Sequence, residues 1–209
     1  MKKLNIKENQ IETVFQSKFM NVYDMHYKEN SHYYNASRLI KENLVCLKNT
    51  EEFQNMRPDA VSCVLILNME EPKLVLCHEF RYPTGQFLLG VPAGLMDEED
   101  CDVIETAQRE IKEECGIHVK REQISIINPL LFSTPGMSDE SNALVCVKVD
   151  SIQNLNADGC EGSELFDGYS LLTIEDALRI LKNGKDDNHI FYSVYTWAAL
   201  MVFVSKMWL

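Results

Sequence analysis

Apolar runs separated by turn residues fill the middle of the chain. Two runs of mainly β-branched and aliphatic residues, 61–67 and 74–80, flank a turn at 69–72, which predicts a β-hairpin. The N-terminal stretch 12–47 mixes apolar and polar positions in the manner of strands and turns. Three more short apolar runs predict strands at 87–91, 124–131 and 143–149.

Apolar residues recur at helical spacing after residue 102. Asp102 is a candidate N-cap, Glu105 completes a capping box with it, and Gly116 is a candidate helix terminator. The apolar stripe of this helix consists of Ile104, Ala107, Ile111 and Cys115. One face of the helix should therefore pack against the rest of the fold.

Two further helices are predicted near the C-terminus. Thr173 and Asp176 form a capping box for a helix over 174–183, and Gly184 ends it. A last apolar helix spans about 189–206. Because strands precede helices and the order is not a regular βαβα alternation, the fold class is α+β or a sheet sandwiched between helices.

The composition is that of an acidic globular protein. Of the 209 residues, 45% are hydrophobic, and 20 basic against 32 acidic residues give a formal net charge of −12. This charge argues against general binding of DNA, RNA or an anionic membrane surface. An acidic protein can still bind phosphates through a bridging divalent cation.

Cysteine usage and the apolar stretches together favour a reducing compartment. The seven cysteines are an odd number and include no C-x-x-C pair, which fits neither a disulfide framework nor a zinc site. The N-terminus has lysines but no apolar run after them, and the longest uncharged stretch, 190–204, is shorter than the roughly 20 residues of a membrane helix. We therefore expect a cytoplasmic protein with no membrane partner.

Three glutamates lie on one side of the helix that starts after Asp102. At 100° per residue, Glu110, Glu113 and Glu114 fall within an arc of about 100°. Their carboxylates repel one another unless they are solvated or share a cation, and oxygen ligands of this kind suit Mg²⁺. A solvated charged face gives the same pattern, so the arc alone leaves both interpretations open.

Residues 109–117, REIKEECGI, resemble the second half of the Nudix box of Nudix hydrolases without a gap. The opening glycine of the box corresponds to Gly94, but fourteen residues separate Gly94 from Arg109 where the family has thirteen. The middle glutamate of the family, which pairs with the box arginine, has no direct counterpart. We expect Asp100 or Glu99 to take its place.

The resemblance implies a metal site on this helix. Glu110 and Glu114 would ligate Mg²⁺ or Mn²⁺, and Glu113 would be a further ligand or act through water. The backbone carbonyl of Ala93 would complete the site, and Arg109 would orient the glutamates.

The flanking residues resemble the ADP-ribose pyrophosphatase subgroup of this family. The subgroup implies a Nudix α/β/α sandwich over 59–209 and a β-rich N-terminal extension over 1–58 that contributes to homodimerisation and substrate contacts. The polar, proline-containing segment 49–58 is a plausible boundary between them. The matching stretches are EFRYP at 79–83, FLLGVPAGLMD at 87–97 and STPGMSDE at 133–140.

Hydrolysis of a diphosphate also needs a carboxylate outside the box to take a proton from the attacking water. The subgroup often places this base on a later loop, which makes Glu164 the first candidate, Glu161 the second and Glu140 the third. Each of these residues has a structural interpretation as well, as part of an acidic surface loop or, for Glu140, of a turn.

Two arginines are candidates for binding the substrate. Arg81 can bind a phosphate oxyanion in bidentate fashion, and Glu79 lies beside it in the same motif. Arg38 resembles a subgroup arginine that follows the N-terminal strands. A surface salt bridge is the alternative interpretation of Arg81. Tyr33, Tyr34 and Phe19 are candidates for stacking on a nucleobase or for packing in a core or interface.

These observations predict an enzyme that hydrolyses the diphosphate bond of a nucleoside diphosphate sugar with Mg²⁺ or Mn²⁺. The first candidate substrate is ADP-ribose, which would be cleaved to AMP and ribose 5-phosphate. The alternatives are another nucleotide sugar, NADH or a dinucleoside polyphosphate as substrate, or a Nudix domain that binds a ligand without turnover. The expected partners are a small nucleotide and a second copy of the chain, and no nucleic acid.

Overall fold

The computed structural model describes residues 6–152, 154–160 and 163–209. The chain divides into two compact units, each with its own sheet and its own apolar core. The first unit comprises Met1–Pro58 and Phe132–Ser141, and the second comprises Asp59–Leu131 and Asn142–Leu209.

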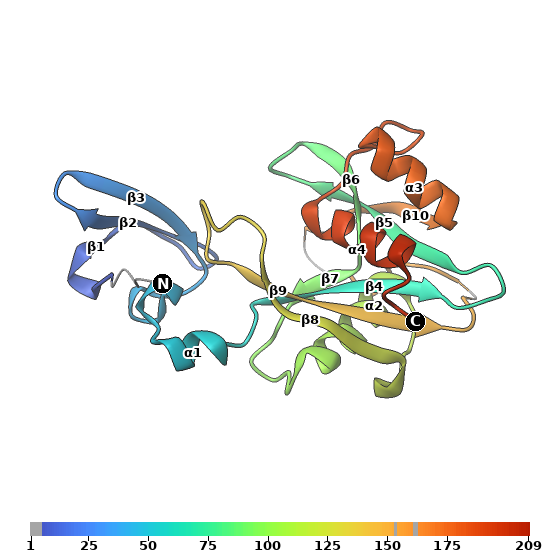
Figure 1. The fold of residues 1–209 in the computed structure, drawn as a ribbon, viewed down its shortest axis with the longest axis horizontal. Helices are drawn as coiled ribbons and strands as arrows, with labels where there is room; N and C mark the ends of the chain where they lie inside the picture. The colour runs from blue at the N-terminus through green and yellow to red at the C-terminus, as the bar shows by residue number, and fades with distance from the viewer. Residues whose placement is uncertain (1–5, 153, 161–162) are drawn as a thin grey trace. The chain divides into compact units, whose positions relative to one another are not determined.

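The first unit is built on a three-stranded antiparallel meander (Figure 1). Ile11, Tyr23, Met25 and Leu44 form its buried core, and the Tyr23 hydroxyl donates to the Leu39 carbonyl at 2.9 Å. Strands are therefore confirmed within 12–47. The strands are β1 (Ile11–Gln16), β2 (Asn21–Lys28) and β3 (Ser31–Ser37), accompanied by 3₁₀ turns at Glu8–Gln10, Lys41–Asn43 and Val45–Leu47.

A short helix, α1 (Thr50–Gln54), lies in the segment that the sequence marks only as polar. The Asn49 side chain accepts hydrogen bonds from the backbone N–H groups of Glu51 and Glu52, and the Glu52 carboxylate accepts from Asn49 N. This reciprocal cap satisfies the otherwise unpaired donors of the first turn. The capping signal is local, but the helix is too short to show apolar periodicity.

The second unit is a mixed sheet in the order β10-β5-β4-β9-β8, with β6 paired to β5 and β7 paired to β4. All eight residues of the central strand β4 are buried, and β4 runs parallel to β9. Burial on both faces explains why 61–67 is apolar at every position except Ser62, which is itself buried. The strands are β4 (Ala60–Leu67), β5 (Lys73–Arg81), β6 (Gln86–Gly90), β7 (Ala93–Leu95), β8 (Ile124–Phe132), β9 (Ser141–Val149) and β10 (Phe166–Leu172).

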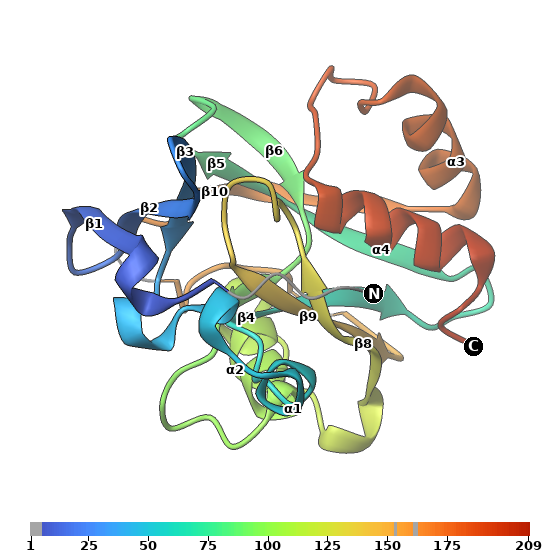
Figure 2. The same ribbon diagram turned by 60° about the vertical axis from the view of Figure 1, so that its left-hand side comes forward.

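Helices cover both faces of this sheet (Figures 1 and 2). Helix α2 (Val103–Cys115) packs its apolar stripe on one face, whereas α3 (Ile174–Asn183) and α4 (Val194–Ser205) pack on the other. A 3₁₀ turn at Arg121–Gln123 leads into β8. These three layers confirm the predicted α/β/α sandwich and the α+β class.

The two C-terminal helices test the capping predictions. Helix α3 has the predicted bounds and the predicted Thr173–Asp176 capping box. The predicted start of the last helix, near 189, is wrong, because α4 begins at Val194 with Ser193 as its N-cap. Residue 189 cannot lie in a right-handed helix, since His189 has a φ of 65°. Within the described residues, no helix is long and apolar enough to cross a membrane.

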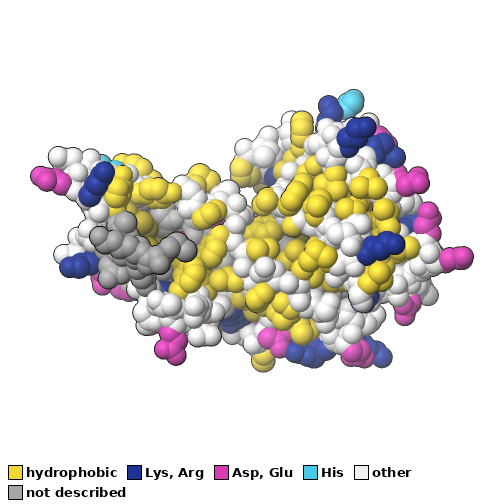
Figure 3. Space-filling view, viewed as in Figure 1, with side chains coloured by type: hydrophobic (Ala, Val, Ile, Leu, Met, Phe, Trp, Pro, Cys, Tyr) yellow, Lys and Arg dark blue, Asp and Glu magenta, His cyan; other side chains and the backbone are white. Residues whose placement is uncertain are grey.

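Helix α4 carries apolar side chains on its outer side as well as on its buried side. Figure 3 shows hydrophobic side chains gathered over α4. Val194, Trp197 and Met201 are exposed, although Ala199, Leu200 and Phe203 of the same helix lie in the core. The outer side of α4 is therefore more apolar than a purely solvated helix surface.

Candidate active site

Helix α2 positions the acidic residues of the candidate site. Asp102 caps the helix by accepting from the N–H groups of Ile104 and Glu105, and Gly116 ends it with a φ of 68°. The predicted capping box is only half present, because the Glu105 carboxylate accepts from Cys101 N instead of Asp102 N. The sheet holds the apolar stripe, so the neighbouring acidic side of the helix faces the edge of the core.

Arg109 is the centre of an ion-pair network at this edge. Its Nη1 donates to Glu110 Oε1 at 2.6 Å and to Glu113 Oε2 at 3.2 Å. Its Nη2 donates to the Leu95 carbonyl at 2.7 Å and to Asp100 Oδ2 at 3.1 Å. One guanidinium therefore ties two box glutamates to β7 and to the loop that precedes α2, which is the orienting role expected of Arg109.

Asp100 takes the supporting position that the shifted box spacing left open. It is 8% exposed, and its Oδ2 accepts from the Thr106 hydroxyl at 2.8 Å and from Asp97 N at 2.9 Å, besides Arg109. Burial acts to raise the pKa of Asp100, but these hydrogen bonds outweigh it and hold that pKa below its ordinary value. The longer loop thus still presents a carboxylate to Arg109.

Gly94 on β7 allows Glu110 to lie against the backbone. A Cβ atom at this position would stand 2.0 Å from Glu110 Oε1 and 2.2 Å from Glu110 Cδ. Only glycine leaves room for a carboxylate this close, and Gly94 needs no left-handed φ. The opening glycine of the box is therefore explained by a close approach to Glu110.

Glu114 is the most deeply buried glutamate of the box, at 3% exposure. Its Oε2 accepts from Ala93 N at 3.2 Å, and its own backbone carbonyl accepts from the Tyr169 hydroxyl on β10. Burial raises the pKa of Glu114 well above its ordinary value, and the charges of Glu110 and Glu79 raise it further. Glu114 is thus held in place by two strands while its charge remains uncompensated.

The other box glutamates differ in their surroundings. Glu110 is 5% exposed, and burial raises its pKa to about 7 even though Arg109 opposes the shift. Glu113 is half-buried and contacts the same guanidinium. The structure therefore places the three glutamates on one side of α2, and it places the Ala93 N–H, rather than its carbonyl, against Glu114.

This donor set is suited to a hard divalent cation. The groups gathered on this side of α2 are carboxylates, and Mg²⁺ and Mn²⁺ prefer oxygen ligands of this kind. Arg109 supplies one positive charge, but Glu110 and Glu114 are both buried and their pKa values are raised, so negative charge at the site exceeds its compensation. The residues present therefore fit a bound Mg²⁺ or Mn²⁺ ion.

Glu79 and Arg81 lie on β5 beside the same cluster. Arg81 Nη2 is 2.6 Å from Glu79 Oε2, and the arginine side chain is 51% exposed while that of Glu79 is 12% exposed. Burial raises the pKa of Glu79, Arg81 opposes the shift, and the charge of Glu164 adds to it. Arg81 thus presents a solvent-accessible guanidinium anchored by a buried carboxylate.

The loop before β10 brings one candidate base to the cluster. Glu164 is exposed, and its charge raises the pKa values of Glu79, Glu110 and Glu114, so it lies near all three. Glu161, the second candidate, lies outside the described residues. Of the candidates in this loop, the structure therefore places Glu164 at the cluster.

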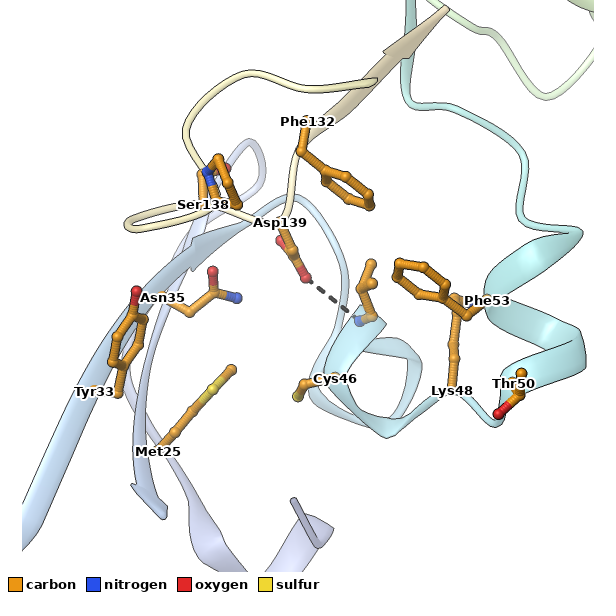
Figure 4. A pocket seen from close by; sticks show the side chains of 12 residues that line it. Met25, Tyr33, Asn35, Cys46, Lys48, Thr50, Phe53, Phe132, Ser138 and Asp139 are labelled. Carbon is orange, nitrogen blue, oxygen red and sulfur yellow. Dashed lines mark hydrogen bonds between the residues drawn. The ribbon is translucent and has the colours of Figure 1, made fainter. Parts of the chain in front are cut away.

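Arg38 and Glu140 belong to the first unit and pair with each other. Arg38 Nε donates to Glu140 Oε1 at 2.8 Å, and both side chains are more than a third exposed. The first unit also encloses a cavity of about 510 Å³, lined in part by Tyr33 and by the stacked rings of Phe53 and Phe132 (Figure 4). Tyr33 is thus part of a cavity wall rather than of a closed core.

Three supporting residues are not found from the sequence. Tyr169 reaches the Glu114 carbonyl from a position 55 residues away, and Cys160 Sγ lies 3.7 Å from the Glu113 carbonyl. Gly159 lies against the α2 backbone, where an added Cβ would be 2.7 Å from Glu113 Cα. The loop that carries Glu164 is therefore packed on the C-terminal half of α2. No local sequence signal indicates these contacts.

The fold and the site together define a class of protein. In this class a helix on one face of the sandwich carries glutamates that an arginine orients, and one of these glutamates lies against a glycine of a neighbouring strand. The family model described as the NUDIX domain matches residues 56–193, about two thirds of the chain. The chain therefore belongs to the Nudix family.

Curated relatives and a solved structure agree with this family. The chain is 36% identical over 93 residues to "Nudix hydrolase 14, chloroplastic" of Arabidopsis thaliana, covering 40% of this chain and 30% of that protein. It is 34% identical over 95 residues to "ADP-ribose pyrophosphatase" of Saccharomyces cerevisiae, covering 44% and 39%. The matches thus span less than half of these relatives. A crystal structure titled as an ADP compounds hydrolase shares the fold, with a TM-score of 0.55 at 19% identity over 95% of this chain and 90% of that one.

Proposed function

We propose that this chain hydrolyses the diphosphate linkage of a nucleoside diphosphate sugar, with ADP-ribose as the first substrate and AMP and ribose 5-phosphate as products. The observation that carries the proposal is the buried glutamate pair of α2, Glu110 and Glu114, held by Arg109 and by the backbone of β7. The similarity to a protein named ADP-ribose pyrophosphatase supports the substrate class.

Glu110 and Glu114 would hold the metal, Glu113 would ligate directly or through water, and the Ala93 carbonyl would add a backbone oxygen. When bound, Mg²⁺ or Mn²⁺ neutralises phosphate charge and lowers the pKa of a bound water. Arg109 keeps the carboxylates in place through its bonds to Glu110 and Glu113. The protein's own contribution would thus be a set of carboxylates whose side chains are oriented by hydrogen bonds from Arg109 and Ala93 N.

Glu164 would act as the general base. It would accept a proton from the attacking water, whose oxygen forms a new bond to one phosphorus while the bridging P–O bond breaks. The second phosphate then leaves with the bridging oxygen and its electron pair. The exposed carboxylate of Glu164, next to the buried glutamates, is suited to the role of general base.

Arg81 would bind a phosphate oxygen through its exposed guanidinium, which Glu79 orients from β5. Arg38 and Glu140 remain candidates from the first unit, as a substrate contact and as a third candidate base. Their mutual ion pair is exposed, so its own contribution to stability is small.

A homodimer is the proposed assembly. Strand β1 and the turn that follows it expose several large apolar side chains: Val14 at 56%, Phe15 at 52% and Phe19 at 72%. Exposed apolar surface of this kind is typical of protein interfaces. Light scattering after size-exclusion chromatography should give twice the mass of one chain. Phe15→Glu should lower the measured mass toward that of the monomer.

The first test of the proposal is AMP release from ADP-ribose with Mg²⁺, alongside other nucleotide sugars, NADH and a dinucleoside polyphosphate. We expect release that favours ADP-ribose and stops with EDTA. Glu114→Gln should abolish it, and His118→Gln, a conservative change of an exposed side chain, should not. Tight ADP-ribose binding without turnover of any compound would instead support a ligand-binding role.

A further inference from the structure

A second group of metal-ligand side chains lies on the N-terminal sheet. Asp24, His26 and His32 offer one ligand atom each, and these atoms all lie within 4.8 Å of one another. None of these residues belongs to the Nudix box. We infer that they bind a divalent transition-metal ion, with Zn²⁺ as the representative.

The strand register places these side chains on one face of the sheet. Asp24 on β2 pairs with Glu12 on β1 and with Tyr34 on β3. His26 is two residues beyond Asp24, and His32 is two residues before Tyr34, so the alternation of side chains puts all of them on the same face. The register of β2 and β3 also shifts between Met25 and Lys28, directly beside His26. Such irregularities redirect side chains and are common beside functional sites.

The two imidazoles converge on one carboxylate oxygen. His32 Nδ1 lies 2.6 Å from Asp24 Oδ2, and His26 Nε2 lies 3.7 Å from the same atom. Ligands of a tetrahedral site with bonds of about 2.0 Å stand about 3.3 Å apart. The observed separations bracket that value, so side-chain shifts of less than about 1 Å would admit an ion.

The buried carboxylate supplies an independent observation. Asp24 is 6% exposed, and although Oδ2 faces the imidazoles, Oδ1 is buried without a hydrogen-bond partner among the described residues. A hydrogen bond to His32 alone leaves this charged group only partly compensated, which is costly in a buried position. A divalent cation would neutralise the carboxylate and give both histidines a common partner.

The donor set selects the class of ion. Two imidazoles with one carboxylate suit Zn²⁺, Ni²⁺, Cu²⁺ or Fe²⁺, whereas the all-oxygen cluster of α2 suits Mg²⁺ or Mn²⁺. The His26 and His32 side chains are 41% and 50% exposed, so an ion can reach them from solvent. Glu12 Oε2 lies 3.8 Å from His26 Nε2 and adds a further negative charge beside the group. The ion would cross-link β2 to β3.

The direct test is a Zn²⁺ titration of the full-length protein in excess Mg²⁺, followed by the imidazole ¹H–¹⁵N NMR signals. The excess Mg²⁺ occupies the oxygen site, and the histidine signals distinguish this site from cysteine thiols. We expect the signals of His26 and His32 to shift together on binding of one equivalent, while those of His78, His118 and His189 stay in place. Unchanged His26 and His32 signals would overturn the inference.

Variants give a second readout by calorimetry. His26→Gln and His32→Gln should each weaken Zn²⁺ binding at least about tenfold, and Asp24→Asn should do the same. His118→Gln, an exposed histidine of the second unit, is the matched control and should bind as the wild type does. Wild-type affinity in both histidine variants would refute the site. If a variant fails to fold, the NMR titration of the wild type still decides the question.

Discussion

Gly94→Ala is the sharpest test of the candidate active site, because it perturbs one carboxylate and little else. The new Cβ would stand 2.0 Å from Glu110 Oε1, whereas ordinary contacts begin near 3.4 Å. The Glu110 carboxylate must therefore retreat by about 1.4 Å, judged against that contact distance. Metal–ligand distances hold within about 0.2 Å, so a shift of this size would remove Glu110 as one of the proposed ligands.

The expected loss of turnover follows from that displacement. A misplacement of about 1 Å at a catalytic group can cost about 100-fold in rate, which corresponds to about 2.7 kcal/mol of transition-state stabilisation. We expect Gly94→Ala to lower kcat on ADP-ribose at least 100-fold and to raise the Mg²⁺ concentration needed for half-maximal rate. The alanine backbone is compatible with this position, so the thermal midpoint should change little.

Gly136→Ala is the matched control for this experiment. Gly136 also lacks a left-handed φ, and the nearest atom to its added Cβ is Tyr33 Oη at 3.9 Å. This variant should keep the Mg²⁺ dependence of the wild type. If Gly94→Ala kept wild-type kcat and metal dependence, the close approach of Glu110 to β7 would have no part in the site, and the reasoning would be refuted.

Three further variants test other parts of the site. Asp100→Asn should lower the free energy of unfolding by about 1.5–3 kcal/mol at pH 7, as expected for lost hydrogen bonds to a charged group. Because the pKa of Asp100 is lowered in the folded state, this difference from the wild type should disappear as the pH falls and the Asp100 carboxylate is protonated. Glu164→Gln should lower kcat about 100-fold or more with little change in ADP-ribose affinity. Glu114→Gln should abolish the Mg²⁺-induced rise in thermal midpoint. It should not lower the midpoint in EDTA, because the raised pKa of Glu114 means that burying this carboxyl group destabilises the metal-free fold at neutral pH.

Each of these expectations has a result that would contradict it. Urea unfolding at several pH values would contradict the first if the Asp100→Asn difference grew on acidification. Steady-state kinetics with unchanged kcat for Glu164→Gln would move the base to Glu161 or Glu140. Thermal unfolding would contradict the third if Glu114→Gln retained the full response to Mg²⁺.

Local signals in the sequence predict the elements that carry the site. The caps and apolar stripe of α2 are adjacent in the chain, so Asp102 and Gly116 indicate its ends correctly. The apolar run of β4, interrupted only by Ser62, likewise indicates burial on both faces of the strand. The start of α4 is mispredicted because the four residues before it, 190–193, are as uncharged as the helix, and only the Ser193 cap marks the boundary.

The contacts that complete the site join distant parts of the chain, and the sequence does not show them. Nothing local distinguishes Asp100 from Glu99 as the partner of Arg109, since the choice depends on how the loop folds over Thr106. The grouping of Phe132–Ser141 with the first unit depends on contacts such as Tyr33 Oη to the Gly136 carbonyl, 103 residues apart. Pairing at this separation depends on the whole topology rather than on propensity.

The burial of the α2 glutamates explains why stability and function oppose each other at this site. Placing Glu110 and Glu114 in the core raises their pKa values, so charging them at neutral pH costs folding free energy. A cation that binds only the folded chain offsets this cost by about 2.7 kcal/mol at 100 times its Kd. The apolar stripe of α2 and the hydrogen bonds from Ala93 and Arg109 must hold the helix until the ion binds. The same packing that stabilises the metal-free fold would therefore also hold the proposed ligands in place for the ion.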